Sequence, residues 1–498
     1  MNSQDRTKAE RLAFGSAFSF VSMLVVRMTT LVNSIVLVRV LGLYDLGVYS
    51  IVVLTVSLAS VLASFGVPQS LVKFLSETQP DRTDDAGRLL GAGVMITMAA
   101  TSLAASALAL VSPLLASVYN ESRVESLLLI GVIGLVLNSL LSPAVATFQG
   151  FELIRELGVR NMVSAVLSVP TTLALVIVWG LEGAVLATVL NSAAAILVNV
   201  SLLRNVWRRR ELSLVLPHEP IVYGKILGYA VPTVVASLLV TPVLWFTSTY
   251  LATEASFAEV GRYSVGYSLA SYLLFIPTAI GVPLVPIISR LDRTKPVELP
   301  PFLVRTLRVG AFLLVPPTLL VMALPAGFLA LVYGAGSVSA APVVRVLAPA
   351  LFLAGVSSIV GFGIAGKGRM WDGLLLNLSW AMVFLIGSLI LVPAEAAIGL
   401  SFAYLAAYIA HFAAAMAYTK YRLSAGLRPL AMPLAIAGIS FAILAASSVL
   451  LADPWRDPLM VEFVIAVTVV ECLALSRREL EVLSGPLRKL ILWIGPSQ

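Results

Sequence analysis

Cysteine, histidine and charged residues are scarce in this sequence of 498 residues. The single cysteine, Cys472, excludes an intramolecular disulfide, and the two histidines, His218 and His411, lack the cysteine partners that would favour a zinc site. Charged residues make up only 12% of the chain, whereas soluble domains contain about 25%. We therefore expect no metal, no cofactor and no redox chemistry, and no large water-soluble domain.

Apolar residues dominate the composition. They make up 59% of the sequence, and the mean hydropathy is +0.98. Apolar runs of about 20 residues or more, bounded by charges or by Pro and Gly, predict transmembrane helices. The chain is therefore predicted to be an all-α polytopic membrane protein. The fourteen predicted spans lie at residues 13–39, 48–71, 89–117, 124–149, 159–180, 183–203, 223–251, 262–289, 302–323, 342–366, 371–392, 396–419, 429–451 and 457–476.

The distribution of Lys and Arg predicts the topology. With the N-terminus inside, 27 of the 33 basic residues fall in segments predicted to be cytoplasmic and only five in outer segments, as the positive-inside rule requires. Both termini are therefore predicted to be cytoplasmic, with an uncleaved first span, in the plasma membrane of a prokaryotic host. The formal net charge of +7 is attributed to loops facing an anionic leaflet rather than to nucleic-acid binding.

The sequence repeats itself after about half its length. Residues 47–50 (GVYS) return as 261–264 (GRYS), and residues 66–68 (GVP) return as 281–283. Because this offset spans six helices, the two halves are predicted to be related by a two-fold axis along the membrane normal. The predicted organisation is an N-lobe at 1–204, a cytoplasmic linker at 205–222, a C-lobe at 223–421, an extra helix pair at 422–476 and a cytoplasmic tail at 477–498.

Three segments of the first helical hairpin resemble a known family. They are residues 39–42 (RVLG), 44–50 (YDLGVYS) and 65–77 (FGVPQSLVKFLSE). They are similar to the signature of polysaccharide exporters in the multidrug, oligosaccharidyl-lipid and polysaccharide exporter superfamily, which includes the O-antigen and lipid II flippases. Ser64 stands where that family often has an acid, and Leu46 where it often has an aromatic residue. The first departure weakens the case for a cation-coupling carboxylate here.

The resemblance implies a fold and a function. The expected fold is a V-shaped pair of six-helix bundles around a central cavity. The expected function is flipping of a polyprenyl-(di)phosphate-linked oligosaccharide from the inner to the outer leaflet by alternating access. Expected partners are this polyprenol-linked glycan, membrane lipids and the glycosyltransferases of the same pathway, and the protein is expected to be a monomer.

Arg27 is the only basic residue predicted near the middle of a span, and no acidic residue is predicted at comparable depth. A cation at the bilayer centre costs at least about 3 kcal/mol. Arg27 is either satisfied by backbone carbonyls and neighbours such as Asn33, or it faces a wet cavity and binds phosphate through charge-assisted hydrogen bonds. We favour the second interpretation, because ionisable groups inside membranes are functional by default.

Four other charged or titratable residues are weaker candidates. Arg39, Arg262 and Arg345 either line the outer mouth of the substrate cavity or extend to the membrane surface. His411 is a candidate for coupling transport to protons, although packing explains a lone histidine in an apolar helix better.

Prolines and the C-terminal helices raise two further expectations. Pro232, Pro242 and Pro283 remove helical hydrogen bonds and mark either hinges or static kinks. By resemblance to lipid II flippases, the extra helix pair is expected to guide the polyprenyl tail, and lateral packing is its alternative role.

Two other functions are alternatives. A cation-coupled multidrug exporter would need buried carboxylates, whereas the predicted spans supply Arg27. A membrane glycosyltransferase or polymerase would need carboxylates or metal ligands on a large outer loop, and the outer connections are short. The sequence contains no Gly-Lys-Ser/Thr phosphate loop, so the chain is predicted to be a transporter without ATPase activity of its own.

Overall fold

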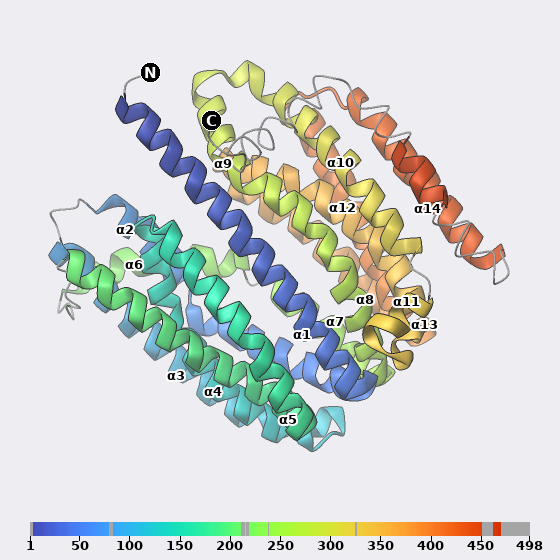
Figure 1. Cartoon of the computed structure of the whole chain (residues 1–498), viewed down its shortest axis with the longest axis horizontal. Coiled ribbons are helices and arrows are strands. Elements are labelled where there is room, and N and C mark those ends of the chain that lie inside the picture. Colours follow the sequence, from blue (N-terminus) through green and yellow to red (C-terminus); the bar gives the residue numbers. More distant parts are fainter. Residues whose placement is uncertain are drawn as a thin grey trace, which may run out of the picture. The chain divides into compact units, whose positions relative to one another are not determined.

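The computed structural model describes residues 3–78, 83–210, 215, 219–237, 239–323, 326–450 and 462–469, and every regular element in these ranges is a helix (Figure 1). The predicted all-α class is therefore confirmed. The α-helices are α1 (Ser3–Ser64), α2 (Val67–Glu77), α3 (Thr83–Tyr119), α4 (Arg123–Gly150), α5 (Ile154–Arg210), α6 (Pro220–Ser237), α7 (Val240–Glu254), α8 (Phe257–Ser271), α9 (Phe275–Thr294), α10 (Leu299–Ala323), α11 (Ala326–Tyr333), α12 (Ala341–Gly366), α13 (Met370–Tyr421) and α14 (Ala431–Leu450). Short 3-10 helices are η1 (Tyr272–Leu274), η2 (Pro296–Glu298), η3 (Ala335–Ala340) and η4 (Arg428–Leu430).

Nine helices in the described ranges are long and apolar enough to cross a membrane. Three of them contain 44, 55 and 52 residues, whereas one crossing needs about 20. Each of these three has one residue with non-helical dihedral angles, which divides it into two spans: Gly42 in α1, Gly180 in α5 and Ala396 in α13. The predicted count of fourteen spans is not settled, because most of the predicted last span lies outside the described residues.

Several predicted spans are divided between elements. The predicted span 223–251 covers α6 and α7, and the predicted span 262–289 covers α8, η1 and α9. Residues 48–71 were also expected to form a single helix, but α1 ends at Ser64 and α2 begins at Val67. Phe65 and Gly66 between them both have positive φ, of 45° and 66°. A Cβ at Gly66 would clash with the backbone of Ala230 in α6, so the glycine allows both the left-handed turn and the close approach of α6.

The backbone carries the repeat that the sequence predicts. Gly180 (φ 54°, ψ −124°) and Ala396 (φ 48°, ψ −123°) have nearly the same dihedral angles and lie 216 residues apart. Three residues after each kink, Gly183 and Gly399 approach a backbone carbonyl so closely that a Cβ would clash with it. The same tight interhelical turn is therefore built in both halves.

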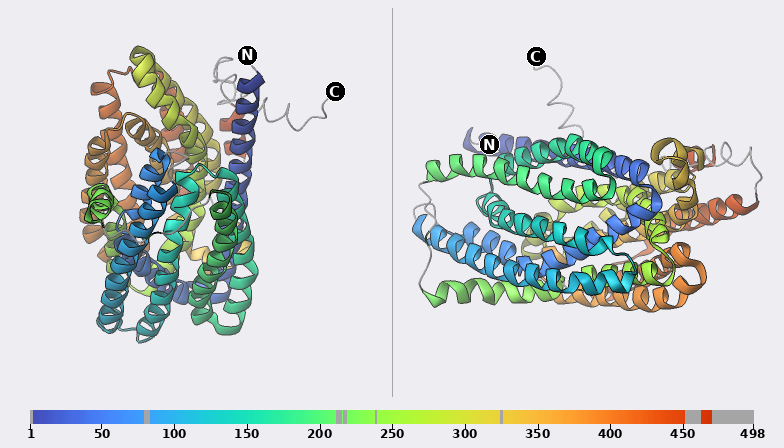
Figure 2. Two further views of the ribbon diagram at one scale, coloured as in Figure 1. Left: turned by 90° about the vertical axis from the view of Figure 1, so that its left-hand side faces the viewer. Right: turned by 90° about the horizontal axis from the view of Figure 1, so that it is seen from below.

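The chain divides into two compact units, residues 1–261 and 262–498. In the first unit α1 packs against α5, and α3 and α4 complete a layer in which α3, α4 and α5 lie side by side (Figure 2). Helices α6 and α7 also belong to this unit. The lobe limits predicted from the repeat, 1–204 and 223–421, stay a prediction about the two halves of the sequence.

In the second unit, α12 packs against α9, α10 and α13, and α14 packs against α10. Helix α14 matches the first member of the predicted terminal pair. Of the second member, only residues 462–469 are described, and they are helical.

Candidate functional site

A groove of about 600 Å³ lies between α1 and α5 in the first unit. Two hydrogen bonds join the helices on either side of Arg27. Ser22 Oγ donates to the Gly158 carbonyl at 3.1 Å, and Asn33 Nδ2 donates to Ser168 Oγ at 2.9 Å. From the first bond to the second, the residue number increases in α1 and also in α5, so the two helices run parallel here.

Two guanidinium groups share this groove without a carboxylate. Arg27 lines it from α1 and Arg160 from α5, and none of the lining residues is Asp or Glu. Within the described chain, Arg27 makes no hydrogen bond or ion pair. Arg160 donates one hydrogen bond from its terminal nitrogen to Asn161 Oδ1 at 2.9 Å, and its Nε is buried without a partner among described residues. The groove therefore carries two positive charges that no described acid neutralises.

Polar atoms beside the arginines add hydrogen-bonding capacity. Ser164 Oγ, which lines the groove, is buried and has no partner in the described chain. Asn33 was predicted as a site residue but is not among the lining residues; its Oδ1 is also buried without a partner in the described chain. Thr29 and Thr30 donate their hydroxyl protons to carbonyls of the preceding turn of α1, so their oxygens retain lone pairs that can accept. Asn33 contacts Ser168 through its amide nitrogen. The groove can therefore bind an anion together with hydroxyl groups.

The two hydrogen bonds between the helices also give the depth of the arginines. Arg160 lies six residues beyond the start of α5 at Ile154, which is about 9 Å at about 1.5 Å per residue. Arg27 is five residues beyond Ser22, whereas Arg160 is two beyond Gly158, so Arg27 lies about 4–5 Å further along the shared direction. Both arginines therefore lie within helices that are long and apolar enough to cross a membrane, Arg27 further along the shared direction than Arg160.

Sequence reasoning misses Arg160 as a site residue, because it assigns this arginine to the basic residues of a cytoplasmic loop. A signal is nevertheless present. Arg160, Ser164 and Ser168 are spaced by four residues and lie on one helical face. All three line the groove.

The other predicted arginines are not among the residues that line this groove. Arg39 is exposed in α1 and does not line it. Arg262 in α8 and Arg345 in α12 belong to the second unit. Each of these three already interacts with other residues of the chain, so none has the uncompensated environment of Arg27.

His411 lies in the second half of α13, where its Nδ1 is 2.9 Å from the Leu376 carbonyl and its ring packs edge-on against Tyr408. Tyr408 continues into a cluster of rings with Tyr404 and Trp380. The histidine is therefore held between the two halves of α13, and its coupling role stays a prediction.

The three predicted hinge prolines lie in three different helices. Pro232 is inside α6, which ends at Ser237, and Pro242 is in the first turn of α7, which begins at Val240. Pro283 is inside α9. Both α6 and α7 fall within one predicted span, 223–251, and bending at the three prolines stays a prediction.

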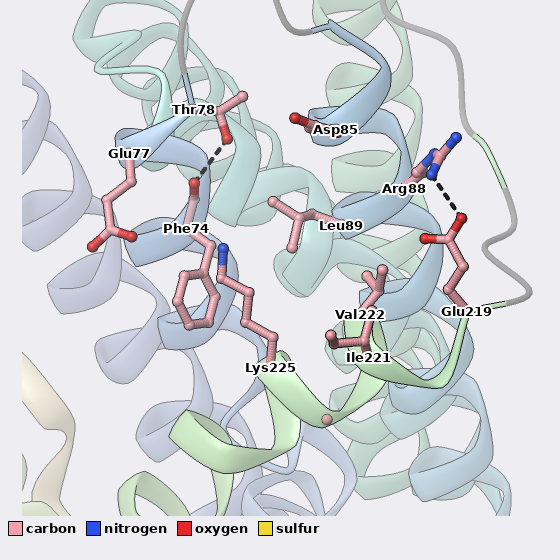
Figure 3. A pocket seen from close by; sticks show the side chains of 11 residues that line it. Phe74, Glu77, Thr78, Asp85, Arg88, Leu89, Glu219, Ile221, Val222 and Lys225 are labelled. Atoms are coloured by element: carbon pink, nitrogen blue, oxygen red, sulfur yellow. Dashed lines mark hydrogen bonds and ion pairs between the residues drawn. The ribbon is translucent and has the colours of Figure 1, made fainter.

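A second groove, of about 720 Å³, lies between α2, α3 and α6 (Figure 3). Its cations are Arg88 and Lys225, and its acids are Glu77, Asp85 and Glu219. Arg88 forms an ion pair of 2.9 Å with Glu219. This groove therefore differs from the first in having carboxylates beside its cations.

Arg123, at the turn between α3 and α4, is also paired with acidic side chains. Arg123 contacts Glu121 and Asp45, each at 3.0 Å. The hydrogen bond from Arg123 lowers the pKa of the Glu121 carboxyl below its ordinary value. The hydroxyl of Tyr44 donates to the same carboxylate at 2.9 Å.

A family model described as "Polysaccharide biosynthesis protein" matches residues 12–292, which is more than half of the chain. The chain belongs to this family. The match includes all the residues that line the groove between α1 and α5. No curated protein matches the sequence.

Solved structures share the fold. A structure titled "Lipid II flippase MurJ, inward closed conformation" aligns with a TM-score of 0.74 at 12% identity, over 92% of this chain and 98% of that one. An inward-facing multidrug resistance MATE family transporter of the MOP superfamily aligns with a TM-score of 0.66 at 13% identity, over 81% and 98%. The Vibrio cholerae MATE transporter VcmN in its bent form aligns with a TM-score of 0.58 at 16% identity, over 84% and 98%. The resemblance to polysaccharide exporters inferred from residues 39–77 is therefore confirmed at the level of the family, and the solved structures share the fold.

Proposed function

We propose that this protein is a flippase that moves a polyprenyl-(di)phosphate-linked oligosaccharide from the inner to the outer leaflet by alternating access. The observation that carries the proposal is the groove between α1 and α5, in which Arg27 and Arg160 have no acid beside them. The family match and the shared fold with a lipid II flippase support it.

The physical argument concerns charge in a medium of low dielectric constant. Moving a phosphate headgroup out of water is costly unless a cation is already in place. Arg27 and Arg160 supply two such cations, and the planar guanidinium group can bind phosphate oxygens through two parallel hydrogen bonds. The substrate in turn supplies the anion that both arginines lack among the described residues.

The remaining groups suit the rest of the substrate. Ser164 and Asn33 offer buried atoms that lack partners in the described chain, and these can hydrogen-bond the sugar next to the phosphate. The polyprenyl tail stays in the lipid, where the extra helix pair at 422–476 guides it. Arg39, Arg262 and Arg345 line the outer mouth of the pathway, and His411 couples transport to protons.

The orientation belongs to the same proposal. Both termini face the cytoplasm of a prokaryotic cell, and the protein works as a monomer that receives its substrate from membrane glycosyltransferases. Single cysteines in a Cys472→Ser background test the orientation. A cysteine at Glu182 should react with an impermeant reagent in intact cells, and one at Arg209 only after permeabilisation. The reverse pattern would contradict the orientation.

A cation-coupled multidrug exporter is the second candidate, because MATE transporters share the fold. Such an exporter would need carboxylates where a cationic cargo binds, and the groove between α1 and α5 has none among its lining residues. A membrane glycosyltransferase or polymerase is disfavoured, since the structures that share the fold are a flippase and transporters.

Transport by the purified protein decides between these candidates. Vesicles that contain the protein and a fluorescent polyprenyl-diphosphate-linked oligosaccharide should expose the glycan to an added lectin faster than empty vesicles. A cationic dye should not be moved in the same vesicles. Dye transport without glycan flipping would replace the proposal with the drug exporter, and new glycosidic bonds formed by the purified protein would replace it with the enzyme.

A further inference from the structure

Arg160, in the groove between α1 and α5, is held at one terminal nitrogen by its neighbour Asn161. Its Nη1 donates to Asn161 Oδ1 at 2.9 Å, and both residues line the groove. The backbone two residues earlier is fixed as well, because the Gly158 carbonyl accepts a hydrogen bond from Ser22 and a Cβ at Gly158 would clash with the Phe18 ring of α1. The guanidinium group is therefore anchored twice, by the packing of its helix and by one side-chain hydrogen bond.

The bond to Asn161 determines which donors of Arg160 remain. A guanidinium group carries five N–H donors in one plane, and its Nε shares an edge with Nη2. Because Nη1 is engaged, this edge keeps both of its nitrogens without a partner among the described residues. Two parallel hydrogen bonds from such an edge match two oxygens of one phosphate. A phosphate bound there would supply the acceptor that the buried Nε lacks within the described chain.

The partner of Arg160 differs in charge from the partner of Arg88 in the second groove. Glu219 is a carboxylate that forms an ion pair of 2.9 Å with Arg88, so it orients that guanidinium group and also neutralises its charge. The side-chain amide of Asn161 is neutral, so it orients Arg160 and leaves the positive charge available. Arginine has many rotamers, and holding it beforehand in the orientation that binds the ligand reduces the entropy lost on binding.

We propose that Asn161 is a positioning residue, which holds Arg160 so that Nε and Nη2 bind two oxygens of one phosphate of the substrate. Asn161 acts through Arg160 and does not itself touch the phosphate. Arg27 lines the same groove from α1 and supplies the second cation. The inference rests on the proposed function, because it takes the anion that binds in this groove to be a phosphate of the lipid-linked substrate.

Binding of farnesyl diphosphate by the purified full-length protein tests this role. The probe carries a diphosphate without a glycan, and isothermal titration calorimetry measures its affinity. Asn161→Leu keeps a side chain of similar size but removes the acceptor, so the affinity should fall about fivefold, as expected when one free side chain must be ordered on binding. Asn377→Leu is the matched control and should match the wild type, because Asn377 is exposed in α13 and does not line the groove.

A double-mutant cycle separates positioning from packing. Arg160→Lys keeps the charge but has no planar edge to orient. In the Arg160→Lys background, Asn161→Leu should therefore leave the affinity almost unchanged, whereas it costs about fivefold in the wild type. A residue that only stabilises the fold would lower the affinity by the same factor in both backgrounds.

Asn161→Asp gives a second readout, in which stability and binding change in different directions. The carboxylate keeps the acceptor oxygen and forms a stronger, charge-assisted hydrogen bond with Arg160, so the melting temperature should not fall. The same carboxylate repels the diphosphate and neutralises Arg160, so the affinity should fall about thirtyfold. A purely structural role of Asn161 does not predict this combination.

Four results would overturn the inference. Wild-type affinity of Asn161→Leu would show that Arg160 is oriented without Asn161, and equal losses in both backgrounds would show a structural role. Unchanged affinity of Asn161→Asp, or no binding of farnesyl diphosphate by the wild type, would show that the phosphate does not bind at Arg160. Failure of the wild type to flip the glycan in vesicles would instead contradict the proposed function, and the effects of these variants on probe binding would still be measurable.

Discussion

The two grooves of the first unit both contain basic side chains, but they differ in whether acidic side chains line the groove as well. Arg27 and Arg160 lie in a groove whose lining has no acid, whereas Arg88 lies in a groove with three carboxylates and forms an ion pair with one of them, Glu219. A cation paired with a carboxylate inside one chain needs no further anion. The comparison teaches that the unpaired arginines, and not basic residues in general, indicate where an anionic substrate binds.

Adding a carboxylate to the first groove should have the largest effect. Ser164→Asp would place an acid beside Arg160 and make the groove resemble the second one. An internal anion would then compete with the substrate phosphate, and binding of polyprenyl-diphosphate-linked glycan should weaken about a hundredfold, which is about 2.7 kcal/mol. Microscale thermophoresis with the labelled lipid measures this loss. Ser164→Asn is the matched control and should bind within about threefold of the wild type.

Removal of the second cation should have an intermediate effect. Arg160→Gln keeps a polar side chain beside Asn161 but removes the charge, so substrate affinity should fall about tenfold. The same binding assay measures it. An unchanged affinity would reduce the site to Arg27 alone and weaken the comparison between the grooves.

The fold could be predicted more fully than this site. Hydropathy located α3, α4, α10 and α12 to within a few residues at most ends, because a spanning helix must be long and apolar. Arg27 was identified because a charge deep inside an apolar run is conspicuous. Arg160 was missed, since a charge near the end of a run is normally assigned to a loop. Only the parallel packing of α1 on α5 brings it beside Arg27.

The positions of the helix breaks could also be predicted only in part from the sequence. Glycine marked two of the kinks, at Gly42 and Gly180. Ala396 adopts a positive φ without being glycine, so its residue type gave no signal. The interruption at Phe65 depends on the approach of α6 to Gly66, and such a contact between distant segments cannot be read from local sequence.

Breaking the ion pair of the second groove should have a small effect. Glu219→Gln leaves Arg88 without its acid, but the two side chains are 42% and 55% exposed. Exposed ion pairs contribute about 0–1 kcal/mol, so the melting temperature should fall by a few degrees at most, and flipping should continue at the wild-type rate. A severe loss of transport in this variant would contradict the comparison, because it would show that a basic residue in an ion pair with an acid can still be needed for transport.

The smallest expected effect is on thermal stability and comes from the ion pair between Arg123 and Glu121 at the turn between α3 and α4. The pKa of Glu121 is lowered in the folded protein, first by the hydrogen bond from Arg123. A lowered carboxyl pKa stabilises the fold above the unfolded value, which is about 4.5, and this contribution is lost as the pH falls through the folded value. The wild type should therefore melt slightly higher than Glu121→Gln at pH 7. The difference should shrink below about pH 4.5, and thermal melting across that range measures it. A difference that is independent of pH would indicate that the carboxylate charge is not involved.

Flipping by arginine variants in purified vesicles tests the central claim most directly. Arg27→Ala, Arg27→Lys and Arg88→Ala are reconstituted at equal protein density, and lectin access to a fluorescent polyprenyl-diphosphate-linked oligosaccharide is followed over time. The account predicts no flipping by Arg27→Ala and partial activity of Arg27→Lys, which keeps the charge without the planar fork. It predicts the wild-type rate for Arg88→Ala, whose cation is already paired. Wild-type flipping by Arg27→Ala would show that the arginine is structural and that the anionic headgroup binds elsewhere.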